Sequence, residues 1–182
     1  MNVYFHSNHA NSIYVKSVIG NYDDTVEIKD SYFYNSFTSN ANGFNVPSSV
    51  SSSSIYGFNS DGWKFGNVSS YTSMSSTVTP TVPFEVDFTM TELSNNGLTL
   101  LLGSSHYVAV NSNSSLTIDG TELATRELNK EYQVKVYSDK IEVYLEGTLL
   151  GSKTVTMSSI AIKLDTGSSR YIRLKDFMIN LL

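Results

Sequence analysis

Short runs that alternate apolar and polar residues, separated by turn groups, dominate the sequence from about residue 55 onward. Successive side chains of a strand point to opposite faces, so each such run has one apolar face. The turn groups between the runs include Asn95-Asn96-Gly97, Asp119-Gly120 and Gly167-Ser168-Ser169. Many short strands with these turns predict an all-β fold, a sandwich or a barrel. The runs are SIYGF, GWKFG, PFEVDFTMTE, LTLLLG, HYVAV, SLTID, EYQVKVY, KIEVYLEG, TLLGSKTV, SIAIKLD and YIRLKDFMINLL.

Composition excludes several classes of function. The chain has 182 residues, a formal net charge of -5 and no cluster of Lys or Arg, so the phosphate contacts of a nucleic-acid binder have no source. It has no cysteine, which excludes disulfides and thiolate metal sites. No apolar run is long enough to span a bilayer, and the start, MNVYFHSNHANS, has no secretory signal pattern. We therefore expect a soluble protein without nucleic-acid binding or membrane insertion.

The chain divides into two parts. Residues 1–30 hold two short runs, NSIYVKSVIG and DDTVEIKD, and are predicted to be an N-terminal strand or arm. Residues 31–182 are predicted to form one domain, within which the Ser/Asn-rich residues 36–54 form a loop or short edge strands. The one stretch with helical character is 121–130.

The phase of the apolar residues predicts one irregularity in the last strand. Ile172 and Leu174 share one phase, whereas Phe177, Ile179 and Leu181 have the other. A β-bulge inserts one extra residue and so reverses the phase. We predict a bulge near Lys175 and Asp176 that brings both sets to the core.

Several segments resemble concanavalin A-like lectin/glucanase domains, including laminin-G-like jelly rolls. The run VYLEGTLL within residues 132–155 is similar to a central hairpin of that superfamily, and RYIRLKDFMINLL to its last strand. FNSDGWKFG followed by PFEVDFTM is similar to its opening strands, and the resemblance covers residues 55–182, or 30–182 at most. It implies a two-sheet antiparallel jelly-roll sandwich with an N-terminal strand or arm. Members of the superfamily bind glycans, hydrolyse them, or serve as spacers and interaction modules.

PFEVDFTMTE also resembles the catalytic strand of laminarinase-like glycoside hydrolases. There Glu85 would match the nucleophile and Asp87 the helper carboxylate. The residue that should be the acid is Thr89, or Met90 with one bulged residue, and neither can protonate a leaving oxygen. We therefore expect no enzyme, and predict that Glu85 and Asp87 lie on the solvated face of a half-buried strand, where they could help to hold a ligand.

Aromatic side chains supply the other candidate ligand contacts. Trp63 is in phase with Phe65, which predicts a core position for both. Tyrosine offers a sugar an apolar face and a hydroxyl donor together. The candidates in or beside polar segments are Tyr56, Tyr71, Tyr107 and Tyr144.

No metal or cofactor is expected. His6 and His9 would point to opposite faces of a strand. The acidic pair Asp23-Asp24 and the group Asp165-Thr166-Gly167 could hold calcium, as some lectin-like jelly rolls do, but turn chemistry explains them equally well. His106 has no serine or carboxylate at a spacing that indicates a catalytic triad.

These observations predict a non-catalytic virion structural or attachment protein of a phage-like tail, baseplate or head surface, with a glycan-binding sandwich. Its partners would be a glycan or cell-surface polysaccharide and other virion or surface proteins, and strand pairing would make it a homo-oligomer at the virion surface. The alternatives are an extracellular or cell-surface carbohydrate-binding module of an adhesin or secreted glycanase, and a laminarinase-like hydrolase.

Overall fold

Two antiparallel sheets packed face to face make up the computed structural model, which describes residues 31–67, 72–94, 98–111, 114–157, 161–166 and 170–182. Sheet A contains, in spatial order, β13 (Thr148–Thr154), β12 (Lys140–Leu145), β11 (Glu131–Val136), β6 (Phe84–Leu93), β15 (Arg170–Leu181), β4 (Gly62–Asn67) and β3 (Gly57–Asn59), and β1 (Ser31–Asn35) also pairs with β15. Sheet B contains β10 (Thr121–Thr125), β9 (Ser115–Ile118), β8 (His106–Val110), β7 (Leu98–Leu102), β14 (Ile162–Thr166), β5 (Thr72–Ser76) and β2 (Phe44–Asn45). The predicted two-sheet antiparallel sandwich is confirmed.

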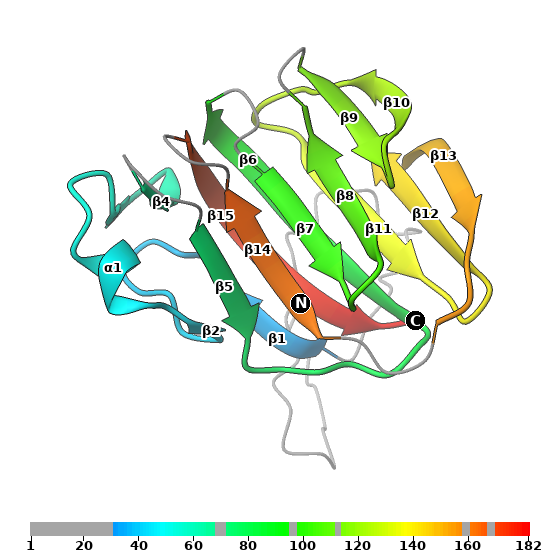
Figure 1. The fold of residues 1–182 in the computed structure, drawn as a ribbon, viewed down its shortest axis with the longest axis horizontal. Helices are drawn as coiled ribbons and strands as arrows, with labels where there is room; N and C mark the ends of the chain where they lie inside the picture. Colours follow the sequence, from blue (N-terminus) through cyan, green and yellow to red (C-terminus); the bar gives the residue numbers. More distant parts are fainter. Residues whose placement is uncertain (1–30, 68–71, 95–97, 112–113, 158–160, 167–169) are drawn as a thin grey trace, which may run out of the picture.

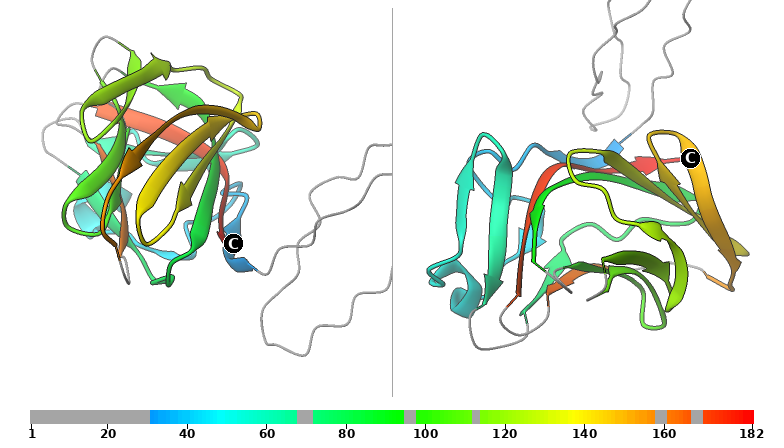
Figure 2. Two further views of the ribbon diagram at one scale, coloured as in Figure 1. Left: turned by 90° about the vertical axis from the view of Figure 1, so that its right-hand side faces the viewer. Right: turned by 90° about the horizontal axis from the view of Figure 1, so that it is seen from above.

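Sheet A bends around sheet B. Sheet B lies in front of sheet A in Figure 1, and the view from above in Figure 2 shows β6 and β15 curving so that both ends of sheet A approach sheet B. Sheet B thus lies on the side toward which sheet A bends. The outer face of sheet A is therefore convex, and the outer face of sheet B lies on the concave side.

The core lies between the sheets and follows the predicted strand phases. Ile141 and Val143 of β12 point inward and are fully buried, whereas Glu142 and Tyr144 point outward and are only partly buried. The inward side chains of β7 in sheet B, Leu98, Leu100 and Leu102, complete the opposite wall. Alternation along single strands was therefore a sound guide to the core.

The predicted bulge in the last strand is confirmed. Lys175 of β15 pairs with Thr89 of β6, and Met178 pairs with Asp87, so Asp176 and Phe177 together oppose one residue of β6. Asp176 has a φ of 52°, in the left-handed region that Asp tolerates better than most residues. The extra residue keeps Phe177 in the core, where it is fully buried.

Trp63 occupies the centre of an aromatic cluster at one end of the core. It is 0% exposed. Rings surround it with centroids 4.4–6.2 Å away, belonging to Phe37, Phe44, Tyr56, Phe58 and Phe65. The predicted core role of Trp63 is confirmed.

The predicted helical character of residues 121–130 is wrong, because Thr121–Thr125 form the edge strand β10, which pairs with β9. The helix of the described residues is α1 (Ser48–Ser51), a single turn inside the Ser/Asn-rich segment, which also contributes β2. Within the described ranges, no helix is long and apolar enough to cross a membrane. The predicted N-terminal arm, residues 1–30, with His6, His9, Asp23 and Asp24, lies outside the described residues.

Candidate functional site

Glu85 and Asp87 lie on the outer face of sheet A, but they are not solvated. Glu85 is 0% exposed and Asp87 is 4% exposed, so the predicted solvated face is wrong at these two positions. β6 is a central strand, and polar side chains of the neighbouring strands contact both carboxylates. Lys135 Nζ of β11 lies 3.4 Å from Glu85 Oε2, and Asn180 Nδ2 of β15 donates a hydrogen bond of 2.9 Å to Asp87 Oδ2. Polar partners inside the sheet thus already engage both carboxylates.

Tyr144 lies on the same convex face and is engaged by charged neighbours. Its hydroxyl donates a hydrogen bond of 2.8 Å to Glu142 Oε2, and Lys135 Nζ lies 5.0 Å from its ring centroid. The hydrogen bond to Glu142, together with burial, raises the pKa of Tyr144 to about 12. A lysine over one face of the ring leaves that face unavailable for stacking on a sugar.

The remaining candidate tyrosines are separated by the structure. Tyr56 packs against Phe58 and Trp63 with centroid distances of 5.3 and 6.2 Å, and burial raises its pKa, so it belongs to the edge of the aromatic cluster. Tyr71 lies outside the described residues. Tyr107, on β8, has outward phase because its neighbour Val108 faces the core. Tyr107 is thus the candidate that lies on the outer face of sheet B.

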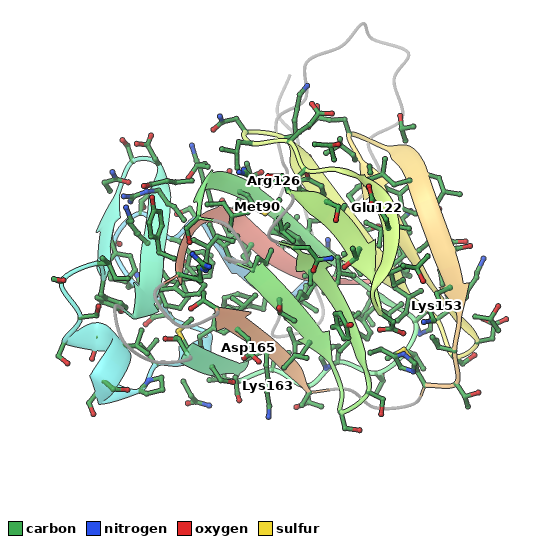
Figure 3. The ribbon with its side chains drawn as sticks, turned by 45° about the horizontal axis from the view of Figure 1, so that its top comes forward. Met90, Glu122, Arg126, Lys153, Lys163 and Asp165 are labelled. Carbon is green, nitrogen blue, oxygen red and sulfur yellow. The ribbon has the colours of Figure 1, made fainter. Side chains whose placement is uncertain are left out.

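That outer face consists of two rows of side chains that run across the strands. The register of β5, β14, β7, β8 and β9 places five outward residues side by side, Ser73, Asp165, Thr99, Ala109 and Thr117. A second row contains Ser75, Lys163, Leu101 and Tyr107. We call these two rows the sheet B face; Figure 3 labels Lys163 and Asp165 on it.

The sheet B face combines small hydroxyl side chains with an aromatic and an aliphatic surface. Ala109, Thr117 and Asp165 of the first row are buried, so the accessible part of this face is the second row together with Ser73 and Thr99. The Tyr107 hydroxyl lies near Gly120, in the turn between β9 and β10. Polar groups beside a few apolar surfaces on a concave side are typical of ligand sites.

Sequence reasoning did not single out Lys163, and it considered Asp165 only as part of a turn that could hold calcium. The prediction that Asp165 belongs to a turn is wrong, because it lies within β14 and is 4% exposed. The described residues contain no group of three His, Asp or Glu side chains that could hold a metal ion. The alternation in SIAIKLD gives both residues one phase, and that signal could have found them together.

His106 has a carboxylate partner that sequence spacing did not reveal. Asp119 Oδ2 lies 2.7 Å from His106 Nδ1 and 3.3 Å from Lys153 Nζ, and Asp119 Oδ1 accepts a hydrogen bond of 2.8 Å from the Tyr107 N–H. Burial opposes ionisation of Asp119, but these partners together lower its pKa. Lys153 belongs to β13 of sheet A, so this group joins the two sheets at their edge. We interpret these contacts of Asp119 as structural, because they hold the edges of the two sheets together.

Comparisons with known proteins give the fold class. Neither a protein-family model nor a curated protein sequence matches the chain. A sialidase superposes on 85% of this chain with a TM-score of 0.67 and 10% identity, and the match spans 19% of the sialidase chain. The carbohydrate-binding module CBM66 from Bacillus subtilis superposes with a TM-score of 0.55 and 12% identity, and the match covers 79% of this chain and 99% of the module. A Bacillus licheniformis β-glucanase superposes with a TM-score of 0.56 and 12% identity, and the match covers 82% of this chain and 97% of the glucanase chain.

These neighbours are jelly-roll sandwiches, and the chain has the concanavalin A-like jelly-roll fold that its sequence predicted. The match to the sialidase is confined to about a fifth of that longer protein, so it compares single domains.

Proposed function

We propose that this protein is a non-catalytic carbohydrate-binding domain that holds its ligand on the sheet B face. The observation that carries the proposal is the placement of Tyr107 beside Leu101, near the small polar side chains Ser73, Ser75 and Thr99, on the outer face of sheet B. The fold supports it, because its neighbours include a carbohydrate-binding module and a β-glucanase.

The chemistry of the sheet B face suits a sugar. Hydroxyl groups of a sugar both donate and accept hydrogen bonds, and Ser73, Ser75 and Thr99 offer matching groups. The C–H edges of a pyranose can pack against the Tyr107 ring and the Leu101 side chain. Such contacts are weak singly, so we expect binding in the micromolar to millimolar range.

The placement of carboxylates supports a non-catalytic role. A retaining glycosidase needs two carboxyls about 5–5.5 Å apart and an inverting one about 6.5–9.5 Å apart. Asp165 on β14 and Glu122 on β10 lie four strands apart, which at about 4.8 Å per strand is roughly 19 Å. On sheet A, the fully buried Glu85 has Thr89 where the acid should be.

Replacing Tyr107 with Ala should weaken glycan binding about tenfold, because stacking and burial of an aromatic ring contribute about 1–1.5 kcal/mol beyond the smaller residue. Tyr144→Ala is the matched control, since Tyr144 is also half-buried and outward but lies on sheet A. A glycan array followed by calorimetry on the best ligand measures both. Equal losses in the two variants, or a loss confined to Tyr144→Ala, would place the ligand elsewhere.

The wild-type protein should release no reducing ends from mixed-linkage or β-1,3-glucans, because Thr89 stands where the acid of sheet A should be and the sheet B carboxylates Asp165 and Glu122 are roughly 19 Å apart. A reducing-sugar assay over long incubation, run in parallel on Glu85→Gln, measures this. Turnover by the wild type that Glu85→Gln abolishes would instead identify a laminarinase-like hydrolase.

The setting in which the domain works is a separate part of the proposal. A virion surface is suggested by the low charge and the absence of cysteine, whereas a module of an adhesin or secreted glycanase fits the same fold equally well. Self-association by strand pairing stays a prediction, and a solution mass measurement tests it.

A further inference from the structure

Lys163 is the single Lys or Arg among the strands of sheet B, and it projects from the concave side. Across the strands its neighbours are Ser75 and Leu101, neither of which carries charge. Its side chain is partly buried. Lys163 therefore supplies the one cation of an otherwise uncharged row of the sheet B face.

Within the described ranges, Lys163 forms no ion pair, in contrast to most of the lysines that the structure describes. Lys64, Lys130, Lys135, Lys140 and Lys153 each pair with a carboxylate. Asp165, two residues along on the same face, is not within ion-pair distance of Lys163. A partly desolvated cation is stabilised by an anion that meets it in a site from which water is excluded.

From these observations we infer that the ligand of the sheet B face is an acidic saccharide, a uronate whose carboxylate contacts Lys163. The inference rests on the proposed carbohydrate-binding function and names its ligand class. The sugar ring packs on Leu101 and Tyr107, the two apolar surfaces in the same row, while its carboxylate lies at Lys163. The hydroxyls of the neighbouring sugar meet Ser73 and Thr99, the accessible polar residues of the first row.

Charge on the rest of the face limits how acidic the ligand is. Asp165 and Glu122 both belong to outward positions of sheet B, and the chain carries a net charge of -5. This negative charge would repel a densely sulfated chain more strongly than a polymer with one carboxylate per sugar.

The test uses the full chain and matched pairs of probes. Oligomers of galacturonate, glucuronate and mannuronate, and their methyl esters, are titrated by calorimetry alongside neutral oligomers of glucose, galactose and fructose. The ester keeps the sugar and removes the charge. We expect at least one uronate to bind, about tenfold or more tighter than its ester, because a charge-assisted hydrogen bond is lost. Raising the salt concentration should weaken the acid but not the ester.

Lys163→Gln should lower the affinity for the acid about tenfold or more and the affinity for the ester much less, so that the preference for the acid is lost. Lys175→Gln is the control, since Lys175 is a partly buried, outward lysine of sheet A that also lacks an ion pair in the described residues. Binding of a neutral oligomer with no uronate binding, or an acid preference that survives Lys163→Gln, overturns this inference and leaves the proposed function standing. Binding of none of the probes at millimolar concentration overturns both.

Discussion

Deleting Met178 should abolish the native fold. The deletion removes one residue directly after the bulge of β15, and the strand can respond in two ways. If the bulge persists, Ile179 moves to an outward position and Asn180 turns into the core. If the bulge dissolves, Asp176 enters the core opposite Phe88 and Phe177 is expelled.

Either response exceeds what a small domain can absorb. Phe177 and Ile179 are both fully buried. Losing one such side chain costs about 2–5 kcal/mol, and burying a polar group without partners adds roughly 1–3 kcal/mol or more. The free energy of unfolding of a typical domain is about 5–15 kcal/mol. Far-UV circular dichroism and a thermal melt should show no cooperative transition in the variant.

Deleting Asp176 is the matched control. Without this residue Phe177 lies directly opposite Phe88, and Met178 keeps its pairing with Asp87, so all later side chains retain their faces. The variant loses the hydrogen bond of 3.2 Å from the Tyr34 hydroxyl to Asp176 Oδ1, and we expect a loss of about 1 kcal/mol. If the two deletions destabilise the protein equally, the bulge does not set the phase of the strand.

The core was predictable because phase is a local property. Trp63 and Phe65, or Ile141 and Val143, are two residues apart, so the two-residue period of a strand decides their face without knowledge of the partner strands. The bulge in β15 was predictable for the same reason. Its first apolar residues, Ile172 and Leu174, alternate in one phase, and the later ones, beginning with Phe177, alternate in the other.

The site was less predictable because it depends on which strands become neighbours. The burial of Glu85 comes from Lys135 and other groups of strands far away in the sequence, which its own alternation cannot report. Lys163 and Tyr107 lie in one row on either side of β7, although 56 positions separate them in the chain (163 − 107). Asp119 reaches His106 across a hairpin whose register the sequence leaves open.

Replacing Trp63 with Ala should lower the free energy of unfolding by about 3–5 kcal/mol, because the largest fully buried side chain is lost and its cavity cannot collapse among rigid rings. Leu149→Ala is the control, since Leu149 is 51% exposed and its truncation should cost less than about 0.5 kcal/mol. Urea unfolding, with equal slopes required for all variants, measures both.

The same variant separates a core residue from a ligand platform. Trp63 projects from sheet A into the core, so no surface of its ring reaches the sheet B face. At a temperature where Trp63→Ala is folded, its affinity for a glycan should equal that of the wild type, whereas Tyr107→Ala loses affinity without a comparable loss of stability. A folded Trp63→Ala protein that no longer binds would show that the aromatic cluster opens to admit the ligand, and would move the site from the sheet B face to the end of the core.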